Sequence, residues 1–277
     1  MAGIPVVSRP PIDIRQVRRN FSSHAEDYDR YARVQKRVAA RLLHLVLPHV
    51  QTGTLALEVG TGTGELARRL LRLCPDASLV VSDLAHGMTR HAAEILGGLP
   101  AVDADAQALP FRSGRFDLVL SASVFQWLND LPAALAEGGR VLRPGGLLAF
   151  AMYGERTLWE LREAHRLAVL ETGGEHGSHA HTFPGEVEVG RALASVGLQP
   201  LQLFAEDELE EHPDVAALLR SLKKIGAQNA SAGRPAGLAS RRVMHRLSTL
   251  YAERFGHEAQ QGIPATYHVI YGLARRA

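Results

Sequence analysis

The sequence predicts a doubly wound α/β domain with a mostly parallel sheet and a helical lid. Three observations support this fold class: short apolar runs alternate regularly with helical patterns, a glycine-rich loop follows the first run, and acidic residues follow the next two. Parallel strands need crossover connections, and helical crossovers cover both faces of a sheet. Beyond Met152 the alternation gives way to longer helical stretches, which we assign to the lid.

Residues 1–48 are predicted to form a loose extension followed by a helix that caps the site. Prolines at positions 5, 10 and 11 favour an irregular start. A helical pattern then runs from residue 22 to residue 48, where a proline ends it. Its apolar face carries residues at helical spacing, namely Tyr28, Tyr31, Val34 and Val38.

Residues 49–207 are predicted to form the core of the domain. The expected strands are 55–59, 78–82, 100–103, 116–121 and 147–152. The expected helices between them are 65–73, 87–96 and 131–142. A Pro-Gly-Gly sequence at 144–146 predicts a turn that reverses the chain before the last of these strands.

The remaining sequence predicts further helices and two long strands. Helices are expected at 157–170, 186–196, 214–225 and 240–255, with a Gly/His-rich loop at 172–181. Strands are expected from 199 to 203, with an extension toward 209, and from 265 to 274. We therefore expect residues 208–264 to form a lid insertion and residues 265–277 to contribute the last core strand.

Composition restricts the class of protein. A chain of 277 residues with 46% hydrophobic residues and a formal charge of +2 is ordinary for a globular enzyme. Cys74 is the single cysteine, so an intrachain disulfide is excluded and a cytoplasmic location is expected. No apolar run reaches the about 20 residues that span a bilayer, and no signal-peptide pattern or metal-ligand cluster is evident, so we expect neither a membrane nor a metal partner.

The glycine-rich loop gives the strongest single indication of a ligand. Gly60, Gly62 and Gly64 let the backbone turn sharply and approach a ligand closely. Phosphate-binding loops usually read G-x-G-x-x-G or end in G-K-[ST], and this loop does neither. Glu58 precedes it, and a carboxylate there suits a cation. The loop therefore predicts a positively charged nucleoside ligand, S-adenosylmethionine (SAM), with a ligand-free glycine turn as the alternative.

Polar residues after the later strands are placed to bind a nucleoside. Asp83 ends the second strand, where it can accept hydrogen bonds from ribose hydroxyls or cap the next helix. Asp105 and Ala106 follow the third strand and suit the amine and ring of adenine. Met88 can pack on the other face of adenine or belong to the core. Ser121 lies at the same edge of the sheet, where ligands of such folds bind.

Four motifs together resemble the class I SAM-dependent methyltransferases. They are Glu58–Gly64 (Glu-Val-Gly-Thr-Gly-Thr-Gly), Ser82–Leu84, Asp105–Phe111 and Phe116–Ser121. The resemblance covers residues 54–152 and implies a Rossmann-like sheet of seven mostly parallel strands. It also implies that the loop lies beneath the methionine part of SAM. The expected cofactor-binding residues are Tyr28, Glu58, Gly60, Gly62, Gly64, Asp83, Leu84, Met88, Asp105, Ala106 and Ser121.

Other segments resemble the malonyl-[acyl-carrier protein] O-methyltransferases of biotin synthesis. These segments are residues 20–29 with Gln35, residues 125–127, residues 220–229 and residues 266–272. This resemblance implies methyl transfer to the free carboxylate of malonyl-acyl-carrier protein, or of malonyl-CoA. The ester would then enter fatty-acid elongation toward the pimeloyl precursor of biotin.

A carboxylate acceptor needs positioning more than proton transfer. It is ionised at neutral pH, so we expect no general base and assign no catalytic acid–base residue. A cation or donor set must hold it, and Arg220 or Lys223 is the predicted cation. The predicted pocket residues are Tyr28, Gln126, Trp127, Tyr267 and His268. Each assignment has a structural alternative. Arg220 and Lys223 can belong to a solvated helix face, Trp127 to the core, and His268 can be an interior histidine with a hydrogen-bond partner.

Basic residues on both lid segments predict a dock for an acidic carrier protein. They are Arg15, Arg18, Arg19, Lys36, Arg37, Arg220, Lys223, Lys224, Arg241, Arg242 and Arg246. No nucleic-acid-binding motif accompanies them, so we do not expect a nucleic-acid partner. The alternative functions are trans-aconitate-type carboxyl methylation, hydroxylation as in similar complex I assembly proteins, and SAM binding without turnover.

Overall fold

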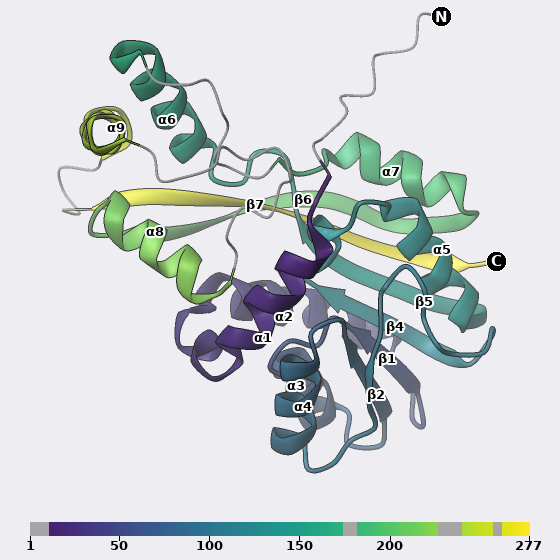
Figure 1. Ribbon diagram of the computed structural model, residues 1–277. Coiled ribbons are helices and arrows are strands. Elements are labelled where there is room, and N and C mark those ends of the chain that lie inside the picture. The colour runs from purple at the N-terminus through teal and green to yellow at the C-terminus, as the bar shows by residue number, and fades with distance from the viewer. Residues whose placement is uncertain (1–10, 174–181, 227–239, 257–261) are drawn as a thin grey trace, which may run out of the picture.

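The computed structural model describes residues 11–173, 182–226, 240–256 and 262–277, which form a seven-stranded sheet flanked by helices (Figure 1). The strand order is β3-β2-β1-β4-β5-β7-β6. Strand β7 runs opposite to the other six strands, which all share one direction. The strands are β1 (Leu55–Val59), β2 (Ser78–Asp83), β3 (Ala101–Asp103), β4 (Phe116–Ala122), β5 (Leu142–Tyr153), β6 (Leu198–His212) and β7 (Ile263–Arg276). The predicted doubly wound, mostly parallel sheet is confirmed.

Strand order explains where a ligand can bind. From β1 the chain winds outward through β2 to β3, and then returns to place β4 on the other side of β1. The loops after β1 and β4 therefore leave the sheet in opposite directions and open a crevice at the carboxyl ends of the strands.

Two apolar layers hold helices on the two faces of the sheet. On one face, α2 (Arg33–Val46) and α3 (Glu65–Leu73) bury Val38, Leu42 and Leu70 against the strands. On the other face, α5 (Leu131–Val141) and α7 (Glu186–Ser195) bury Leu135 and Leu193. The apolar side chains recur at helical spacing in each helix, so burial of one stripe fixes how the helix lies on the sheet.

The N-terminal region contains two helices rather than the predicted single helix over 22–48. Helix α1 (Ile14–Tyr31) begins earlier because Asp13 caps it by accepting a hydrogen bond from the Gln16 amide at 3.1 Å. The chain leaves helical geometry at Ala32, where ψ is 49°, before α2 begins. A short 3-10 turn over Leu47–His49 follows α2. The break lets α1 leave the direction of α2 and cross the carboxyl edge of the sheet (Figure 1).

The turn predicted at 144–146 is instead part of β5. Pairing with β4 is irregular there, because the register shifts between Phe116 and Leu118 while β5 advances from Leu142 to Leu147. Gly145 has a φ of +79°, which a glycine adopts without strain. The Pro-Gly-Gly sequence therefore produces a bulge that bends the strand without ending it.

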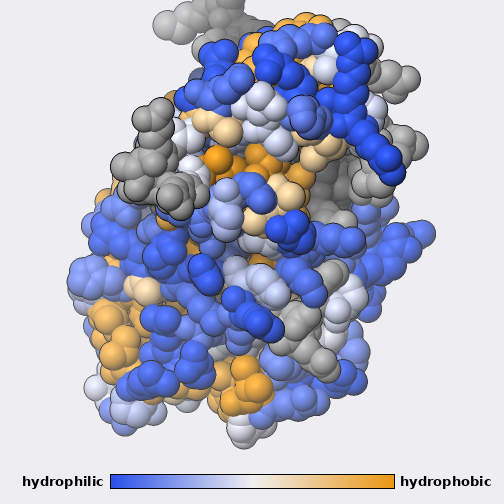
Figure 2. Space-filling view, turned by 90° about the vertical axis from the view of Figure 1, so that its left-hand side faces the viewer, coloured by the Kyte–Doolittle hydropathy of each residue, from blue (hydrophilic) through white to orange (hydrophobic). Residues whose placement is uncertain are grey.

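The remaining helices lie beyond one end of β6 and β7 (Figure 1). They are α6 (Trp159–Thr172), α8 (Val215–Lys224) and α9 (Arg241–Phe255). Helix α4 (His86–Ile95) instead connects β2 to β3 along the chain. Helix α6 packs on α9, with the rings of Trp159 and Phe255 5.1 Å apart. The end of helix α8 packs closely against α1. A Cβ added to Gly226, just after α8, would lie only 3.3 Å from the Asn20 backbone. The side of the molecule that carries these helices is largely hydrophilic, with an apolar hollow in its upper half (Figure 2).

No helix in the described ranges is both long and apolar enough to cross a membrane. The loop predicted at 172–181 and the segment from 227 to 239 lie mostly outside the described residues.

Candidate functional site

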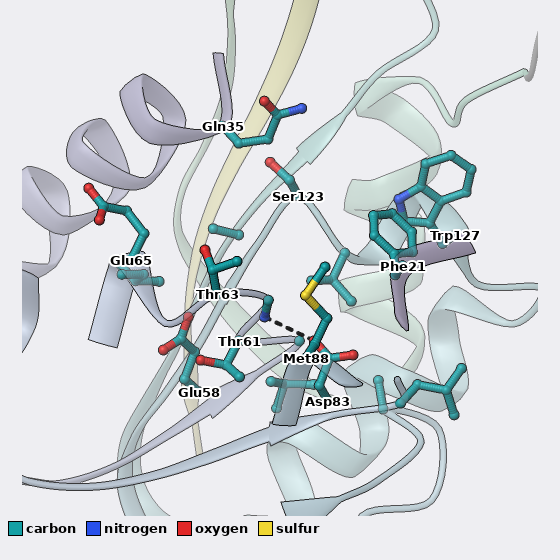
Figure 3. Close-up of a pocket in the computed structure, with 18 of the residues that line it drawn as sticks. Phe21, Gln35, Glu58, Thr61, Thr63, Glu65, Asp83, Met88, Ser123 and Trp127 are labelled. Atoms are coloured by element: carbon teal, nitrogen blue, oxygen red, sulfur yellow. Dashed lines mark hydrogen bonds between the residues drawn. The ribbon is translucent and has the colours of Figure 1, made fainter. Parts of the chain in front are cut away.

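A cavity opens at the carboxyl ends of β1, β2 and β4, beneath α1 (Figure 3). It encloses about 1040 Å³ of space that no protein atom fills, including the open solvent at its mouth. Most of the predicted cofactor residues line it together. They are Tyr28, Glu58, Gly60, Gly62, Asp83, Leu84, Met88, Asp105 and Ala106.

The glycine loop is held tightly against neighbouring strands. The amides of Gly60 and Thr61 both donate to the Ser82 carbonyl, at 2.7 and 2.9 Å. Gly60 has a φ of +73°, and a Cβ there would lie 2.2 Å from a methyl carbon of Val124. Glycine is therefore required at position 60 for both conformation and space.

Asp83 connects the loop to the start of α4. Its two carboxylate oxygens accept hydrogen bonds from the amides of Gly62 at 2.9 Å and Ala85 at 2.8 Å (Figure 3). Burial raises the pKa of Asp83, although these amides oppose the increase. Asp83 lines the cavity while it makes both bonds. It can therefore hold the start of α4 and also bind a ligand.

Glu58 places a second buried carboxyl group below the loop. It is 2% exposed, and its Oε2 atom has no hydrogen-bond partner among the described residues. Burial raises the pKa of Glu58 to about 8, the Thr61 hydroxyl lowers it, and nearby Asp83 raises it further. A buried, incompletely satisfied carboxyl group is well suited to a positively charged ligand.

Aromatic and apolar side chains from α1 and from the segment after β4 form another wall. The ring of Phe21 lies 6.3 Å from that of Tyr28 and 5.7 Å from that of Trp127. Met88 packs with Tyr28 and Phe21 across the same space. Such a wall can pack on a nucleobase, and an aromatic face attracts a sulfonium.

Several cavity residues were not among the predicted cofactor or acceptor residues. Asp29 accepts a hydrogen bond from the Thr63 hydroxyl at 2.7 Å, and Lys36 donates to the Asp29 carbonyl at 2.7 Å. These bonds join α1, α2 and the glycine loop. The other such residues include Phe21, Gln35, Thr61, Glu65, Ser123 and Val124. Local sequence patterns do not identify them, because their positions depend on how α1 packs over the sheet.

Two predicted cofactor residues do not line the cavity. Gly64 precedes α3 with a φ of +80°, and a Cβ there would lie 2.9 Å from Leu96. Ser121 lies within β4, where its hydroxyl donates to the Val59 carbonyl at 2.9 Å. This hydrogen bond holds the Ser121 hydroxyl within the sheet, whereas Ser123, which lies beyond the end of the strand, lines the cavity.

The predicted acceptor residues are divided between the cavity and other sites. Trp127 lines the cavity, while Gln126 is buried behind it and donates to the Ser123 carbonyl at 2.7 Å. Tyr267 is buried in β7 outside the cavity lining. His268 lies 2.8 Å from an Asp207 oxygen on the adjacent strand, which matches its structural alternative.

Arg220 and Lys223 are exposed on α8, and neither lines the cavity. No described residue from 208 to 264 does so either. Of the predicted lid segments, α1 and α2 cover the cavity, and α8 supports α1 from outside.

These residues fit SAM. The glycine loop leaves room that a Cβ would fill, Glu58 supplies a buried carboxyl group that a bound cation would ionise, and Asp83 places its carboxylate at the cavity. Asp105 and Ala106 line the same cavity, where a carboxylate and a small apolar side chain suit adenine.

Titration of Glu58 predicts that SAM affinity depends on pH. A positively charged ligand favours the ionised carboxylate, so we expect binding to release a proton near pH 7 and to strengthen as the pH rises from 6 to 8. Glu58→Gln should remove both effects. Calorimetry in two buffers with different ionisation enthalpies measures the proton release.

Glu65→Gln is the matched control at another glutamate of the cavity. Burial raises the pKa of Glu65, but hydrogen bonds from Arg68 and Arg69 outweigh this effect, so the net pKa is lowered. Its removal should leave proton release unchanged. Equal proton release in wild type and Glu58→Gln would contradict the assignment.

Comparison with solved structures supports the fold. The chain matches the [4+2]-cyclase SpnF with a TM-score of 0.59 and 17% identity, covering 100% of this chain and 99% of that one. It matches a phosphoethanolamine N-methyltransferase of Haemonchus contortus with a TM-score of 0.52 and 17% identity, covering 86% of this chain and 52% of that one. At such identities the likeness shows the class I methyltransferase fold and no particular reaction.

Sequence comparison is more specific. Residues 57–150 match the methyltransferase domain family. The chain is 30% identical to the mitochondrial arginine-hydroxylase NDUFAF5 of Danio rerio over 93% of this chain and 79% of that protein. It is 48% identical to a malonyl-[acyl-carrier protein] O-methyltransferase of Geobacter sulfurreducens over 96% of this chain and 100% of that protein. With that identity over nearly its whole length, the chain belongs to the malonyl-[acyl-carrier protein] O-methyltransferase family.

Proposed function

We propose that this protein transfers a methyl group from SAM to the free carboxylate of malonyl-acyl-carrier protein. The 48% identity to the Geobacter sulfurreducens enzyme over essentially both full chains carries this proposal. The product is a malonyl methyl ester, whose masked charge lets the chain enter fatty-acid elongation toward the pimeloyl part of biotin. A cytoplasmic location fits this role and the single cysteine.

SAM is the cofactor, and when bound it supplies a methyl group whose carbon–sulfur electron pair stays on sulfur as the acceptor oxygen forms the new bond. Glu58 would supply a carboxylate to this cation, and Asp83 would accept hydrogen bonds from the ribose. Asp105 would accept from the adenine amine, while Met88 and Tyr28, which lie together at the cavity, would pack on apolar and cationic parts.

The acceptor carboxylate is already ionised, so the protein contributes positioning and exclusion of water rather than a base. Helix α1 closes one side of the cavity through Phe21 and Tyr28, and Trp127 closes another. The hydrogen bonds that join Asp29 to Thr63 and Lys36 fix α1 relative to the glycine loop. Helix α8 contributes to the lid indirectly, because the residues that follow its end pack on α1.

The test compares methyl acceptors. Purified protein is incubated with labelled SAM and malonyl-acyl-carrier protein, malonyl-CoA or trans-aconitate, and base-labile methyl ester is counted. We expect ester on malonyl-acyl-carrier protein, and a lower rate with malonyl-CoA would show that the carrier is recognised. Transfer only to trans-aconitate, or SAM binding without transfer to any of the three, would contradict the proposal.

Exposed cations on adjacent helices support docking of the acidic carrier. Arg15, Arg18 and Arg19 on α1 and Arg220 and Lys223 on α8 are exposed and make no ion pair within the described residues. Because α8 ends against α1, the two helices present these charges on adjoining surfaces. We call these five residues the basic surface.

Charge reversal on the basic surface should weaken carrier use selectively. For Arg220→Glu/Lys223→Glu we expect kcat/KM for malonyl-acyl-carrier protein to fall about 10-fold at low salt and the difference to shrink at high salt. Transfer to malonyl-CoA and SAM affinity should be unchanged. Arg72→Glu/Arg191→Glu, at exposed positions on α3 and α7, matches the change in net charge. Equal losses in the two double variants, or equal losses with both acceptors, would argue against docking there.

A further inference from the structure

Two hydroxyl groups beside the cavity are buried without serving the fold. Ser123 Oγ and Tyr153 Oη are both inaccessible to solvent, and neither has a hydrogen-bond partner of good geometry among the described residues; the two hydroxyls lie close enough to interact with each other. Burying an unsatisfied hydroxyl is unfavourable, so such groups usually have a ligand or a functional role.

The backbone positions these hydroxyls on the side of the cavity away from Asp83. Ser123 follows β4, lines the cavity and lies on the side that Gln35 closes (Figure 3). Tyr153 ends β5, the strand next to β4. The Ser123 hydroxyl lies near enough to lower the pKa of Tyr153, although burial raises it more strongly. The Tyr153 phenol therefore stays protonated and remains a hydrogen-bond donor.

The local structure is strained and firmly held. Ser123 has a φ of +60°, which is unfavourable for a residue other than glycine. Its amide donates to the Ala151 carbonyl at 2.8 Å, and its carbonyl accepts from Gln126 Nε2 at 2.7 Å. The Tyr153 amide in turn donates to Gln126 Oε1 at 3.4 Å. Gln126 thus links both residues, which gives this predicted acceptor residue a positioning role.

Packing also restricts the Tyr153 side chain. Its ring lies 5.6 Å from the ring of Tyr267 and 6.2 Å from that of Phe183. Tyr267, which the sequence predicted to shape the acceptor pocket, therefore supports Tyr153 from behind. A hydroxyl on a fixed ring loses little entropy when it binds a ligand.

The charges around the cavity favour neutral donors for an anionic acceptor. Lys36 is the sole lysine or arginine among the described residues that line it, and its ammonium already donates to the Asp29 carbonyl. A full ion pair would also stabilise the carboxylate before the reaction and so reduce its nucleophilicity. A neutral donor reduces the nucleophilicity of the carboxylate less.

We propose that Ser123 Oγ and Tyr153 Oη form the binding site for the acceptor carboxylate. Both hydroxyls donate to one carboxylate oxygen and leave the second oxygen to accept the methyl group. This assignment rests on the proposed function, because it needs a carboxylate acceptor. It replaces a cation on α8 with two neutral hydroxyls as the groups that hold the reacting carboxylate.

Binding measurements test the site separately from turnover. With S-adenosylhomocysteine present, wild-type protein should bind malonyl-acyl-carrier protein more tightly than acetyl-acyl-carrier protein, which lacks the carboxylate. Ser123→Ala and Tyr153→Phe should each reduce this preference about 10-fold and lower kcat/KM for malonyl-acyl-carrier protein about 10- to 100-fold. SAM affinity should change less than about 3-fold.

Tyr271→Phe is the matched control. It removes another buried hydroxyl that has no partner of good geometry among the described residues. Neither tyrosine is itself among the residues that line the cavity, but the Tyr153 hydroxyl lies beside that of Ser123, which does, whereas Tyr271 lies in β7 and stacks on Phe204. It should keep the malonyl preference and the rate. Thermal unfolding of each variant identifies any loss that comes from destabilisation.

The outcomes separate the two proposals. If Ser123→Ala and Tyr153→Phe both kept the turnover rate and the malonyl preference of the wild-type protein, this assignment would be overturned and the proposed function would stand. Equal loss of SAM and acceptor affinity would also overturn it, because the hydroxyls would then belong to the cofactor site. A wild-type protein that neither methylates nor prefers malonyl-acyl-carrier protein would overturn both.

Discussion

Gly60→Ala should abolish measurable methyl transfer and weaken SAM binding by at least about 100-fold. The new Cβ would lie 2.2, 2.8 and 3.0 Å from three side-chain carbons of Val124, and the φ of +73° is unfavourable for alanine. Val124 is branched at Cβ and cannot move its methyl groups away by bending a long side chain. The loop would therefore shift from the position that the Ser82 carbonyl holds. Equilibrium binding of SAM measures the effect.

Two companion variants separate crowding from backbone strain. Gly97 has a φ of +68°, and a Cβ there would meet nothing within 4 Å, so Gly97→Ala tests strain alone and should leave SAM affinity intact. Val124→Ala removes the two closest methyl carbons and should restore part of the affinity when combined with Gly60→Ala. If the double variant bound SAM no better than Gly60→Ala alone, contact with Val124 would not be the cause.

Asp83→Asn is expected to have the second largest effect, weakening SAM binding about 100-fold. Both carboxylate oxygens of Asp83 accept from backbone amides, so the amide group of asparagine would place N–H against N–H at Gly62 or Ala85. The variant also loses the negative charge that we propose binds the ribose hydroxyls. Hydrogen bonds to a charged acceptor are the stronger kind, so loop geometry and ligand contact both suffer. Calorimetric titration with SAM checks this result.

Asp103→Asn is the matched control for this substitution. Asp103 is the register partner of Asp83 at the end of β3, but it is exposed, contacts His86 and does not line the cavity. It should bind SAM like the wild type. If Asp83→Asn also kept full affinity while its melting temperature fell, Asp83 would act only in the fold.

The relationship to NDUFAF5 shows why the acceptor must be tested directly. A chain 30% identical to this one is named an arginine hydroxylase, although the glycine loop belongs to a fold shared by many reactions. The cofactor half of the cavity does not choose between these reactions. The acceptor side does, and there the structure presents Ser123, Gln126 and Trp127 around the end of β4.

The core elements were predictable because they are recorded in local patterns. Residues 55–59 and 65–73 were placed at their observed bounds, since an apolar strand and an amphipathic helix differ in periodicity. The same patterns placed Glu58, Asp83 and Asp105 at one edge, because the carboxyl ends of parallel strands share an edge of the sheet. The break at Ala32 and the bulge at Gly145 were missed, since tertiary packing decides them.

The sequence by itself determined the fold class, the glycine loop and the acidic residues that line the cavity. Only the tertiary structure decided that Ser123 rather than Ser121 reaches the cavity, that Arg220 lies outside it, and that α1 covers it. These outcomes depend on contacts between distant segments, such as Gly87 of α4 against the Ser22 backbone and Gly226 against Asn20. Local periodicity specifies which face of an element is apolar, but the partner that covers this face is fixed only when the whole chain packs.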